Sequence, residues 1–289
     1  MAPSFGLDPL IVALVLLAAV LHASWNAVLK AASDRVTASA LMNLTGLAVG
    51  GLLALFVSAP APASWGFILL SVAIHFSYFL FLLGSYRYGD LSQVYPLARG
   101  VAPLIVAFVS PWLIGERLGP VQLAGVIVLC LGILSLAFNR MRLRELMDWK
   151  PVAMALATGA SIAAYTVVDG LGVRISGSPG GYIAWLFVLD GISMTGVAAW
   201  LRGRTLGHAV RSIWKPAVLG GLVAMLAYGI VIWCYSLGAI APIAALRETS
   251  VVIAAGIGTL LLREPFGRWR IAAASFCAIG IVAINLPLR

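Results

Sequence analysis

The chain has 289 residues, of which 62% are hydrophobic and only 10% are charged, and its formal net charge is +9. Soluble globular domains carry about 25% charged residues, so this composition excludes an ordinary water-soluble protein. Basic residues of membrane proteins usually face a membrane surface, so the positive charge does not indicate nucleic-acid binding. We expect an all-α integral membrane protein whose surroundings are the lipid bilayer.

Ten apolar runs are long enough to cross a membrane, which takes roughly 17 to 25 residues per helix. The runs are continuous and lack the alternating pattern of β-barrel strands. The sequence therefore predicts ten transmembrane helices, at residues 9–29, 36–58, 65–85, 92–114, 121–138, 151–171, 180–201, 215–236, 239–262 and 270–287.

Polar side chains recur at helical spacing on the first and third predicted helices. His22, Trp25 and Asn26 share one face of the first helix, and His75 and Tyr78 share one face of the third. Such faces are expected to line a hydrated or ligand-filled cavity. The alternative is ordinary hydrogen bonding between helices, worth about 0.6 kcal/mol per bond.

The fourth predicted helix carries a buried arginine. Tyr95, Arg99 and Pro103 follow one another at intervals of four residues and so lie on one face. An arginine at the bilayer centre costs about 2.5 to 3.5 kcal/mol, so Arg99 is expected to face an internal cavity. It either contacts substrate there or neutralises an internal acid. Glu116 closes this helix, and pairing with a nearby arginine is its expected role.

The segment around Arg99 occurs a second time in the chain. With a constant spacing of 148 residues, Arg99 corresponds to Arg247, Glu116 to Glu264 and Gly132 to Gly280. Two copies of five helices each place the second copy in the membrane with the opposite orientation, an arrangement common in secondary transporters. We predict two inverted five-helix repeats, at residues 1–145 and 146–289.

Further candidate residues lie in the second half. Ser161, Tyr165 and Asp169 share a face of the sixth predicted helix, and Tyr228 lies in the eighth. Asp190 lies near the centre of the seventh helix, where an ionised carboxylate needs a cation or a proton. Pairing with an arginine is preferred for Asp190, and carriage of a proton is the alternative.

Glu248 follows Arg247 directly in the ninth predicted helix. The corresponding position of the first half is Gly100, so the acid is present in one copy only. This asymmetry marks Glu248 either as a coupling residue or as the partner of an internal ion pair. Arg247 is the stronger of the two arginine candidates for contact with substrate.

Patterns for catalysis and for cofactor or metal binding are missing from the sequence. Cys130, Cys234 and Cys277 lie inside apolar runs without paired spacing, and two histidines on different helices do not make a metal site. Nucleophile motifs, zinc-protease motifs and phosphate-binding loops are absent. We expect neither an enzyme nor a bound cofactor.

Basic residues are distributed unevenly over the predicted loops. The odd-numbered loops hold most of the lysines and arginines, which favours a cytoplasmic location for them and places both termini outside. The expected location is the cell (inner) membrane of a bacterial-type cell. Because both halves are fused in one chain, a monomer is expected to be functional, and glycine-rich helix faces would also permit a homodimer.

These features resemble the drug/metabolite transporter superfamily, and within it the ten-helix EamA-type transporters. The resemblance covers essentially the whole chain and rests on four segments: HASWNAVLK at 22–30, LSQVYPLARGVAPLIVAFVSPWLIGERL at 91–118, AAYTVVDGLG at 163–172 and APIAALRETSVVIAAGIGTLLLREP at 241–265. It implies a central cavity formed chiefly by the first, third, fourth, sixth, eighth and ninth helices. The segment around YPLAR is also similar to a branch found with phosphonate-utilisation functions.

The resemblance and the two arginines together predict a secondary transporter of a small anionic or zwitterionic metabolite, such as an amino acid, an organic acid or a phosphonate. Guanidinium groups bind carboxylates and phosphonates through two parallel hydrogen bonds. Two alternatives stay open. One is a proton-coupled exporter of lipophilic cations that uses Asp190 and Glu248, and the other is a membrane-embedded enzyme or lipid-handling protein.

Overall fold

The computed structural model describes residues 7–32, 34–88, 91–138, 149–202, 206–262 and 268–286. In the described ranges every regular element is helical. The helices are α1 (Pro9–Ala31), α2 (Arg35–Ala54), η1 (Pro62–Ser64), α3 (Trp65–Tyr88), α4 (Leu91–Leu113), α5 (Pro120–Phe138), α7 (Trp149–Ile175), α8 (Pro179–Arg202), α9 (Leu206–Leu237), α10 (Ile240–Arg247), α11 (Ser250–Leu262) and α12 (Arg268–Asn285).

The helices have the length and composition of membrane spans. Nine stretches of the described chain are long and apolar enough to cross a membrane, and Trp269–Asn285 forms a shorter apolar helix. Large apolar side chains such as Phe56, Phe108 and Trp200 are exposed on the outside of the bundle. In water such a surface would be unfavourable, whereas lipid solvates it. The protein is a multi-pass, all-α membrane protein, as the composition predicts.

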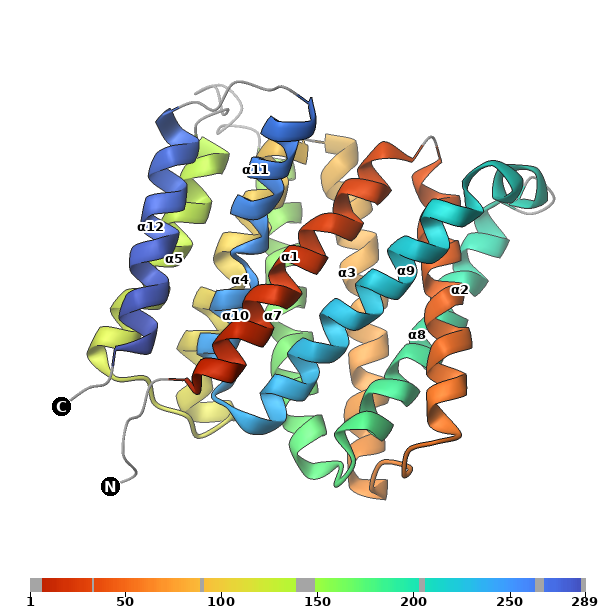
Figure 1. Ribbon diagram of the computed structural model, residues 1–289, viewed down its shortest axis with the longest axis horizontal. Helices are drawn as coiled ribbons and strands as arrows, with labels where there is room; N and C mark the ends of the chain where they lie inside the picture. Colours follow the sequence, from red (N-terminus) through yellow and green to blue (C-terminus); the bar gives the residue numbers. More distant parts are fainter. Residues whose placement is uncertain are drawn as a thin grey trace.

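Two helices begin at an acidic residue whose side chain binds the free backbone amides of the first turn. Asp8 Oδ1 accepts a hydrogen bond from the Leu10 amide at 2.7 Å, and Asp34 Oδ1 accepts from the Val36 and Thr37 amides. These caps satisfy groups that lack a partner inside the helix. Asp8 and Asp34 thus mark the starts of α1 and α2, which run in opposite directions in Figure 1.

The two halves of the chain are packed into one another. The largest helix interfaces join α2 to α8, α5 to α12, α3 to α7 and α1 to α9. In each pair one helix comes from the first half and the other from the second. Figure 1 shows α1 rising and α7 descending, so the corresponding first helices of the two halves run in opposite directions. This is the pairing that a pseudo-two-fold axis in the membrane plane would produce.

Glycines allow α5 and α12 to approach closely at one end of the bundle (Figure 1). A Cβ atom added to Gly125 would lie 2.8 Å from the Ile284 amide nitrogen, and one added to Gly280 would lie 2.7 Å from the Gly125 carbonyl oxygen. Small residues at helix contacts are the usual means of close packing in a membrane.

We expect Gly125→Ala to lower the free energy of unfolding by about 1 to 3 kcal/mol, because the new methyl group overpacks this interface. The measurement is detergent-induced unfolding of the purified protein. Gly256→Ala in α11 is the matched control, because a Cβ there meets nothing within 4 Å. Equal losses for both variants would contradict the packing account.

The ninth predicted span, 239–262, is wrong as a single helix. It is divided into α10 and α11 by a tight turn at Glu248 and Thr249. The Glu248 and Thr249 amides bind the carbonyls three residues back instead of four, and the Thr249 hydroxyl donates to the Leu246 carbonyl at 2.7 Å. The helix is therefore wound more tightly at this point and is interrupted there. Two other boundaries differ more modestly, since α2 ends at Ala54 and α9 already begins at Leu206.

Candidate functional site

The carboxylate of Glu248 lies between the two arginines that the repeat singles out. Arg99 Nη1 donates to Glu248 Oε2 at 3.1 Å, and Arg247 donates from Nε and Nη2 to Oε1 at 3.0 and 2.8 Å. All three side chains are at most 4% exposed. We call Arg99, Arg247 and Glu248 the arginine cluster. Pairing with an internal acid, one of the two alternatives for these arginines, is observed, and one acid serves both.

His22 adds a neutral partner to the arginine cluster. Its Nε2 atom lies 2.8 Å from Arg99 Nη2. A guanidinium group only donates hydrogen bonds, so Nε2 accepts and the ring proton lies on Nδ1. The neutral ring adds no charge, and two guanidinium groups face one carboxylate. The arginine cluster therefore carries one positive charge that no described contact within it balances.

The local fold explains how the arginine cluster forms. Arg99 lies in α4, which contacts α10, while Arg247 is the last residue of α10 and Glu248 caps that helix. The tight turn at Glu248 and Thr249 places this acid at the break between α10 and α11. Helices interrupted near the middle of a membrane are typical of ion and substrate sites in transporters.

Aromatic side chains connect the arginine cluster with the rest of the interior. The Arg99 guanidinium lies 5.3 Å from the Tyr95 ring centre, and that of Arg247 lies 5.8 Å from the Tyr165 ring centre. Tyr165 also packs edge-on against Tyr78 at 6.1 Å and Tyr228 at 6.0 Å. Four predicted tyrosines thus gather around the arginines from α3, α4, α7 and α9, as the polar helix faces indicate.

Asp190 pairs with a histidine and not with an arginine. Its Oδ2 atom lies 2.7 Å from His75 Nδ1, whereas Oδ1 is buried and accepts no hydrogen bond from the described residues. The preferred expectation of an arginine partner is therefore wrong. The reason is the packing of α3 against α8, which brings His75 to Asp190, while Glu248 occupies both arginines. The His75 ring lies 4.4 Å from that of Tyr165.

Asp169 is another buried acid, which lies on the predicted polar face of α7 but is not one of the predicted site residues. It is 0% exposed. The Tyr182 hydroxyl donates to Oδ1 at 3.0 Å and the Tyr228 hydroxyl donates to Oδ2. An acid in the middle of a membrane span is itself a signal of function, and this signal was available in the sequence.

Trp25 and Asn26 are less closely connected to the arginines. The Trp25 ring packs edge-on against His22 at 5.0 Å, and the Asn26 side-chain amide donates to the His22 carbonyl at 2.8 Å. Both residues therefore support His22. Among the described residues, Asn26 makes its side-chain hydrogen bond to His22 and none to either arginine.

A separate ion pair joins the halves at the end of the bundle where α9 meets α10. Arg174 Nη2 donates to Glu116 Oε1 at 2.5 Å and to the Gly238 carbonyl, and Arg174 Nε donates to the Tyr235 carbonyl. Glu116 Oε2 accepts from the Ile240 amide at 2.9 Å. We call Glu116 and Arg174 the clamp.

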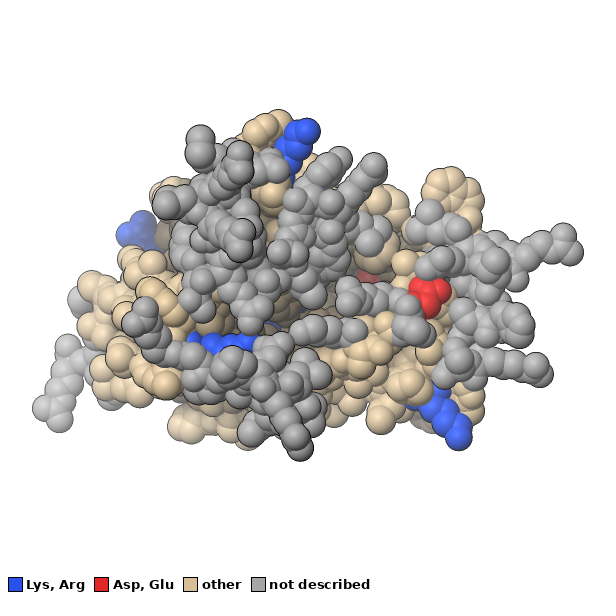
Figure 2. Space-filling model, turned by 90° about the horizontal axis from the view of Figure 1, so that it is seen from above, with Lys and Arg blue, Asp and Glu red and all other residues tan. Residues whose placement is uncertain are grey.

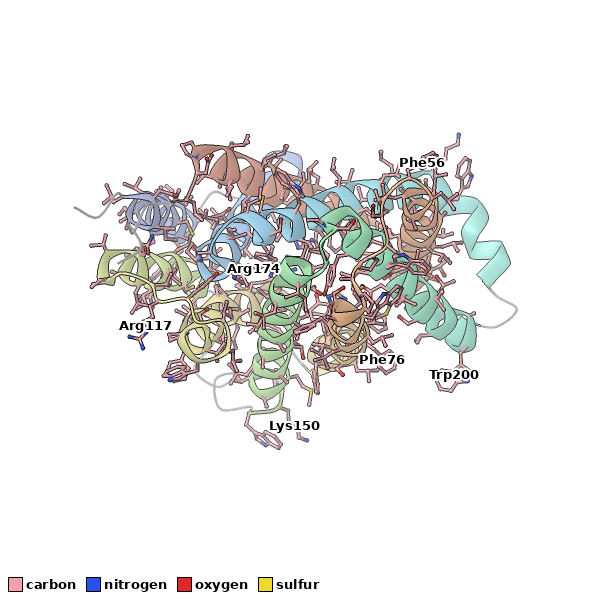
Figure 3. All side chains as sticks on the ribbon, turned by 90° about the horizontal axis from the view of Figure 1, so that it is seen from below. Phe56, Phe76, Arg117, Lys150, Arg174 and Trp200 are labelled. Atoms are coloured by element: carbon pink, nitrogen blue, oxygen red, sulfur yellow. The ribbon has the colours of Figure 1, made fainter. Side chains whose placement is uncertain are left out.

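The clamp confirms the predicted pairing of Glu116 with an arginine, although the expected counterpart Glu264 lies outside the described residues. Glu116 follows Gly115, whose φ of 79° is accessible chiefly to glycine and turns the chain after α4. In Figure 3 Arg174 lies among the helices, whereas Arg117 lies at the outer edge of the bundle. The clamp therefore fastens α4, α7 and the α9–α10 connection to one another.

We expect Arg174→Lys to lower the free energy of unfolding by about 1 to 2 kcal/mol, since a lysine lacks the planar fork that reaches three acceptors at once. Thermal unfolding in detergent measures this loss. Arg117→Lys is the matched control, because Arg117 is exposed. If both variants were as stable as the original protein, the clamp would not contribute to stability and this account of it would be contradicted.

Charged side chains are sparse on the outer surface of the described chain. Figure 2 shows a few basic and acidic side chains among uncharged ones on the face seen from above, apart from the grey residues. The three acids inside the bundle and their partners therefore stand out against an apolar background. Among the described residues, no three His, Cys, Asp or Glu side chains come close enough to hold a metal ion.

Comparison with known proteins gives a family model that matches the first part of the chain, and a similar fold. The model of the EamA-like transporter family matches residues 9–138. A crystal structure of another protein superposes with a TM-score of 0.73 at 20% sequence identity, covering 96% of each chain. At this identity the similarity establishes the fold alone. No curated protein matches the chain.

Proposed function

We propose that the chain, whose residues 9–138 match the model of the EamA-like transporter family, is a secondary transporter of a small polar metabolite with a carboxylate or phosphonate group. The substrate is anionic or zwitterionic, and the protein exports or exchanges it across the cell membrane. We propose transport without a chemical reaction of the substrate.

The observation that carries this proposal is the charge of the arginine cluster. Arg99 and Arg247 share the single carboxylate of Glu248, and these side chains are almost completely buried. An isolated positive charge in a low-dielectric interior is costly, and a bound anion relieves this cost. Guanidinium groups bind carboxylate and phosphonate oxygens with charge-assisted hydrogen bonds, so an anionic group is the ligand that suits the cluster.

The surrounding tyrosines suit a small molecule with an apolar or cationic part. Tyr95 and Tyr165 lie against the two guanidinium groups, and Tyr78 and Tyr228 continue the aromatic surface. Alternating access would come from rocking of the two halves about this site. The break between α10 and α11 supports this proposal, since it gives the chain a point of bending next to Arg247.

Export of lipophilic cations is the competing function, and one observation favours it. Asp169 and Asp190 lie near the rings of Tyr165, Tyr228 and His75, and aromatic rings together with a carboxylate bind organic cations. A cation bound there would leave the arginine cluster without a ligand. The sign of the transported charge separates the two functions.

Counterflow in proteoliposomes tests the proposal. Vesicles are loaded with an unlabelled compound and diluted into a solution of the same compound in labelled form. The compounds tested are a panel of amino acids, organic acids, phosphonates and one lipophilic cation. We expect a compound with an acidic group to exchange and the lipophilic cation to remain outside. Exchange of the lipophilic cation alone would overturn the proposed function. The substrate-binding residues would then be the acids Asp169 and Asp190.

A further inference from the structure

We propose that Asp169, Asp190 and His75 form a proton-binding site that is coupled to the arginine cluster, so that each anionic substrate molecule crosses the membrane with one proton. We call these three residues the acid cluster. The inference rests on the proposed function and adds the coupling ion to it.

The first argument is the connection between the members of the acid cluster. His75 binds Asp190 through Nδ1, and the His75 ring lies 5.9 Å from the ring of Tyr228, whose hydroxyl donates to Asp169. Chains of Asp, Glu and His inside a membrane are typical of proton relays. The buried Oδ1 atom of Asp190, which has no hydrogen-bond partner among the described residues, offers a place for a proton.

The second argument is the charge of the acid cluster. Two acids and one histidine carry one net negative charge when both acids are ionised and the histidine is protonated. One more proton makes the cluster neutral. Asp169 is fully buried, and it accepts hydrogen bonds from two tyrosine hydroxyls, neither of which is a cation. An uncompensated buried carboxylate is costly, so protonation of the cluster is favoured when nothing else balances it.

The third argument links the two clusters. Without ligands, the arginine cluster holds one excess positive charge and the acid cluster one excess negative charge. Tyr165 connects them, since its ring lies 4.4 Å from the His75 ring and 5.8 Å from the Arg247 guanidinium. The two excess charges stabilise each other across this short separation. An anion bound at the arginines removes the positive charge, and the acid cluster then takes up a proton.

The same count of charges applies to the two clusters taken together with their described neighbours. The charged and titratable side chains around the acid cluster come from four helices: His75 and Tyr78 from α3, Tyr165 and Asp169 from α7, Tyr182 and Asp190 from α8, and Tyr228 from α9. Beyond Tyr165 lie Arg247 and Glu248 at the end of α10, Arg99 and Tyr95 from α4, and His22 from α1. With the tyrosines and His22 neutral, this set has zero net charge both empty and with anion plus proton. The anion alone leaves a net negative charge, and the proton alone leaves a net positive one.

A pH gradient across proteoliposomes tests the coupling. The substrate is the panel compound that has a net negative charge and exchanges in counterflow. It is added outside the vesicles, where the pH is lower than inside. A pH-sensitive dye trapped in the vesicles reports the entry of protons. We expect the anion to accumulate against its gradient together with dye acidification. In Asp169→Asn the ratio of gradient-driven accumulation to counterflow should fall roughly tenfold or more, as is typical of coupled sites.

A second variant keeps the test decisive if Asp169→Asn does not fold, and a control variant accompanies both. His75→Gln removes another member of the acid cluster and should abolish dye acidification. Asp34→Asn is the matched control, because Asp34 caps α2 and asparagine caps equally well, so both readouts should equal those of the original protein.

Other results would overturn the coupling. The coupling is contradicted if the anion accumulates to the same extent with and without a pH gradient. It is also contradicted if the protein exchanges only zwitterions, or if Asp169→Asn and His75→Gln both remain fully coupled. Failure of every acidic compound in counterflow contradicts the proposed function instead, so the two failures are distinguishable.

Discussion

Glu248→Gln is expected to lower the free energy of unfolding by about 3 to 5 kcal/mol, the cost of removing one partner of a buried ion pair. Glutamine keeps the shape of the side chain but loses its charge. Arg99 and Arg247 would then be two buried cations facing one another without the carboxylate that now lies between them. Unfolding in mixed detergent micelles measures the loss.

Glu116→Gln is the matched control for this effect. It removes the same charge from the clamp, where Arg174 is 29% exposed and Glu116 18% exposed. Exposed ion pairs contribute only about 0 to 1 kcal/mol, so the control should lose far less stability. A loss for Glu248→Gln no larger than that of Glu116→Gln would contradict the assignment of Glu248 as the shared counter-ion.

Arg247→Gln is expected to reduce counterflow of the acidic substrate about 10- to 150-fold, since a hydrogen bond to a charged group contributes about 1.5 to 3 kcal/mol. Glu248 keeps Arg99 as its partner in this variant, so the protein should stay folded. Without Arg247 the arginine cluster is neutral, and its attraction for an anion is lost.

The control for Arg247→Gln is Arg117→Gln, which removes an exposed arginine at the outer edge of the bundle (Figure 3). Rates are compared only for protein with an unchanged unfolding transition. Counterflow in Arg247→Gln equal to that in Arg117→Gln would mean that the arginine cluster is a structural ion pair and does not contact substrate.

The positions of the membrane helices were predictable because hydropathy alone selects them. Nine described stretches qualify as spans, and the predicted limits are mostly close to those of the helices. The division of the ninth span was not predictable, because Leu246, Thr249 and Ser250 are compatible with a continuous helix. It depends on a local turn in which the Thr249 side chain binds the Leu246 carbonyl.

The sequence predicts which residues belong to the candidate site better than it predicts which acid pairs with which base. The repeat identified Arg99 and Arg247, and the cost of a charge in lipid required that both face the interior. Which acid balances them depends on contacts between residues nearly 150 positions apart, such as Arg99 and Glu248. For the same reason the sequence favours an arginine as the partner of Asp190, whereas in the structure α3 brings His75 to it.

The measurement that tests the central claim most directly is binding of a matched pair of ligands to the purified protein. The pair is the panel compound that exchanges in counterflow and its uncharged amide or ester, and calorimetry measures both affinities for the original protein and for Arg247→Gln. We expect the acid to bind the original protein about 10- to 150-fold more tightly than its uncharged form, and the preference to disappear in Arg247→Gln. Equal affinities of the acid and the uncharged form for the original protein would contradict the claim that the arginine cluster recognises an anion.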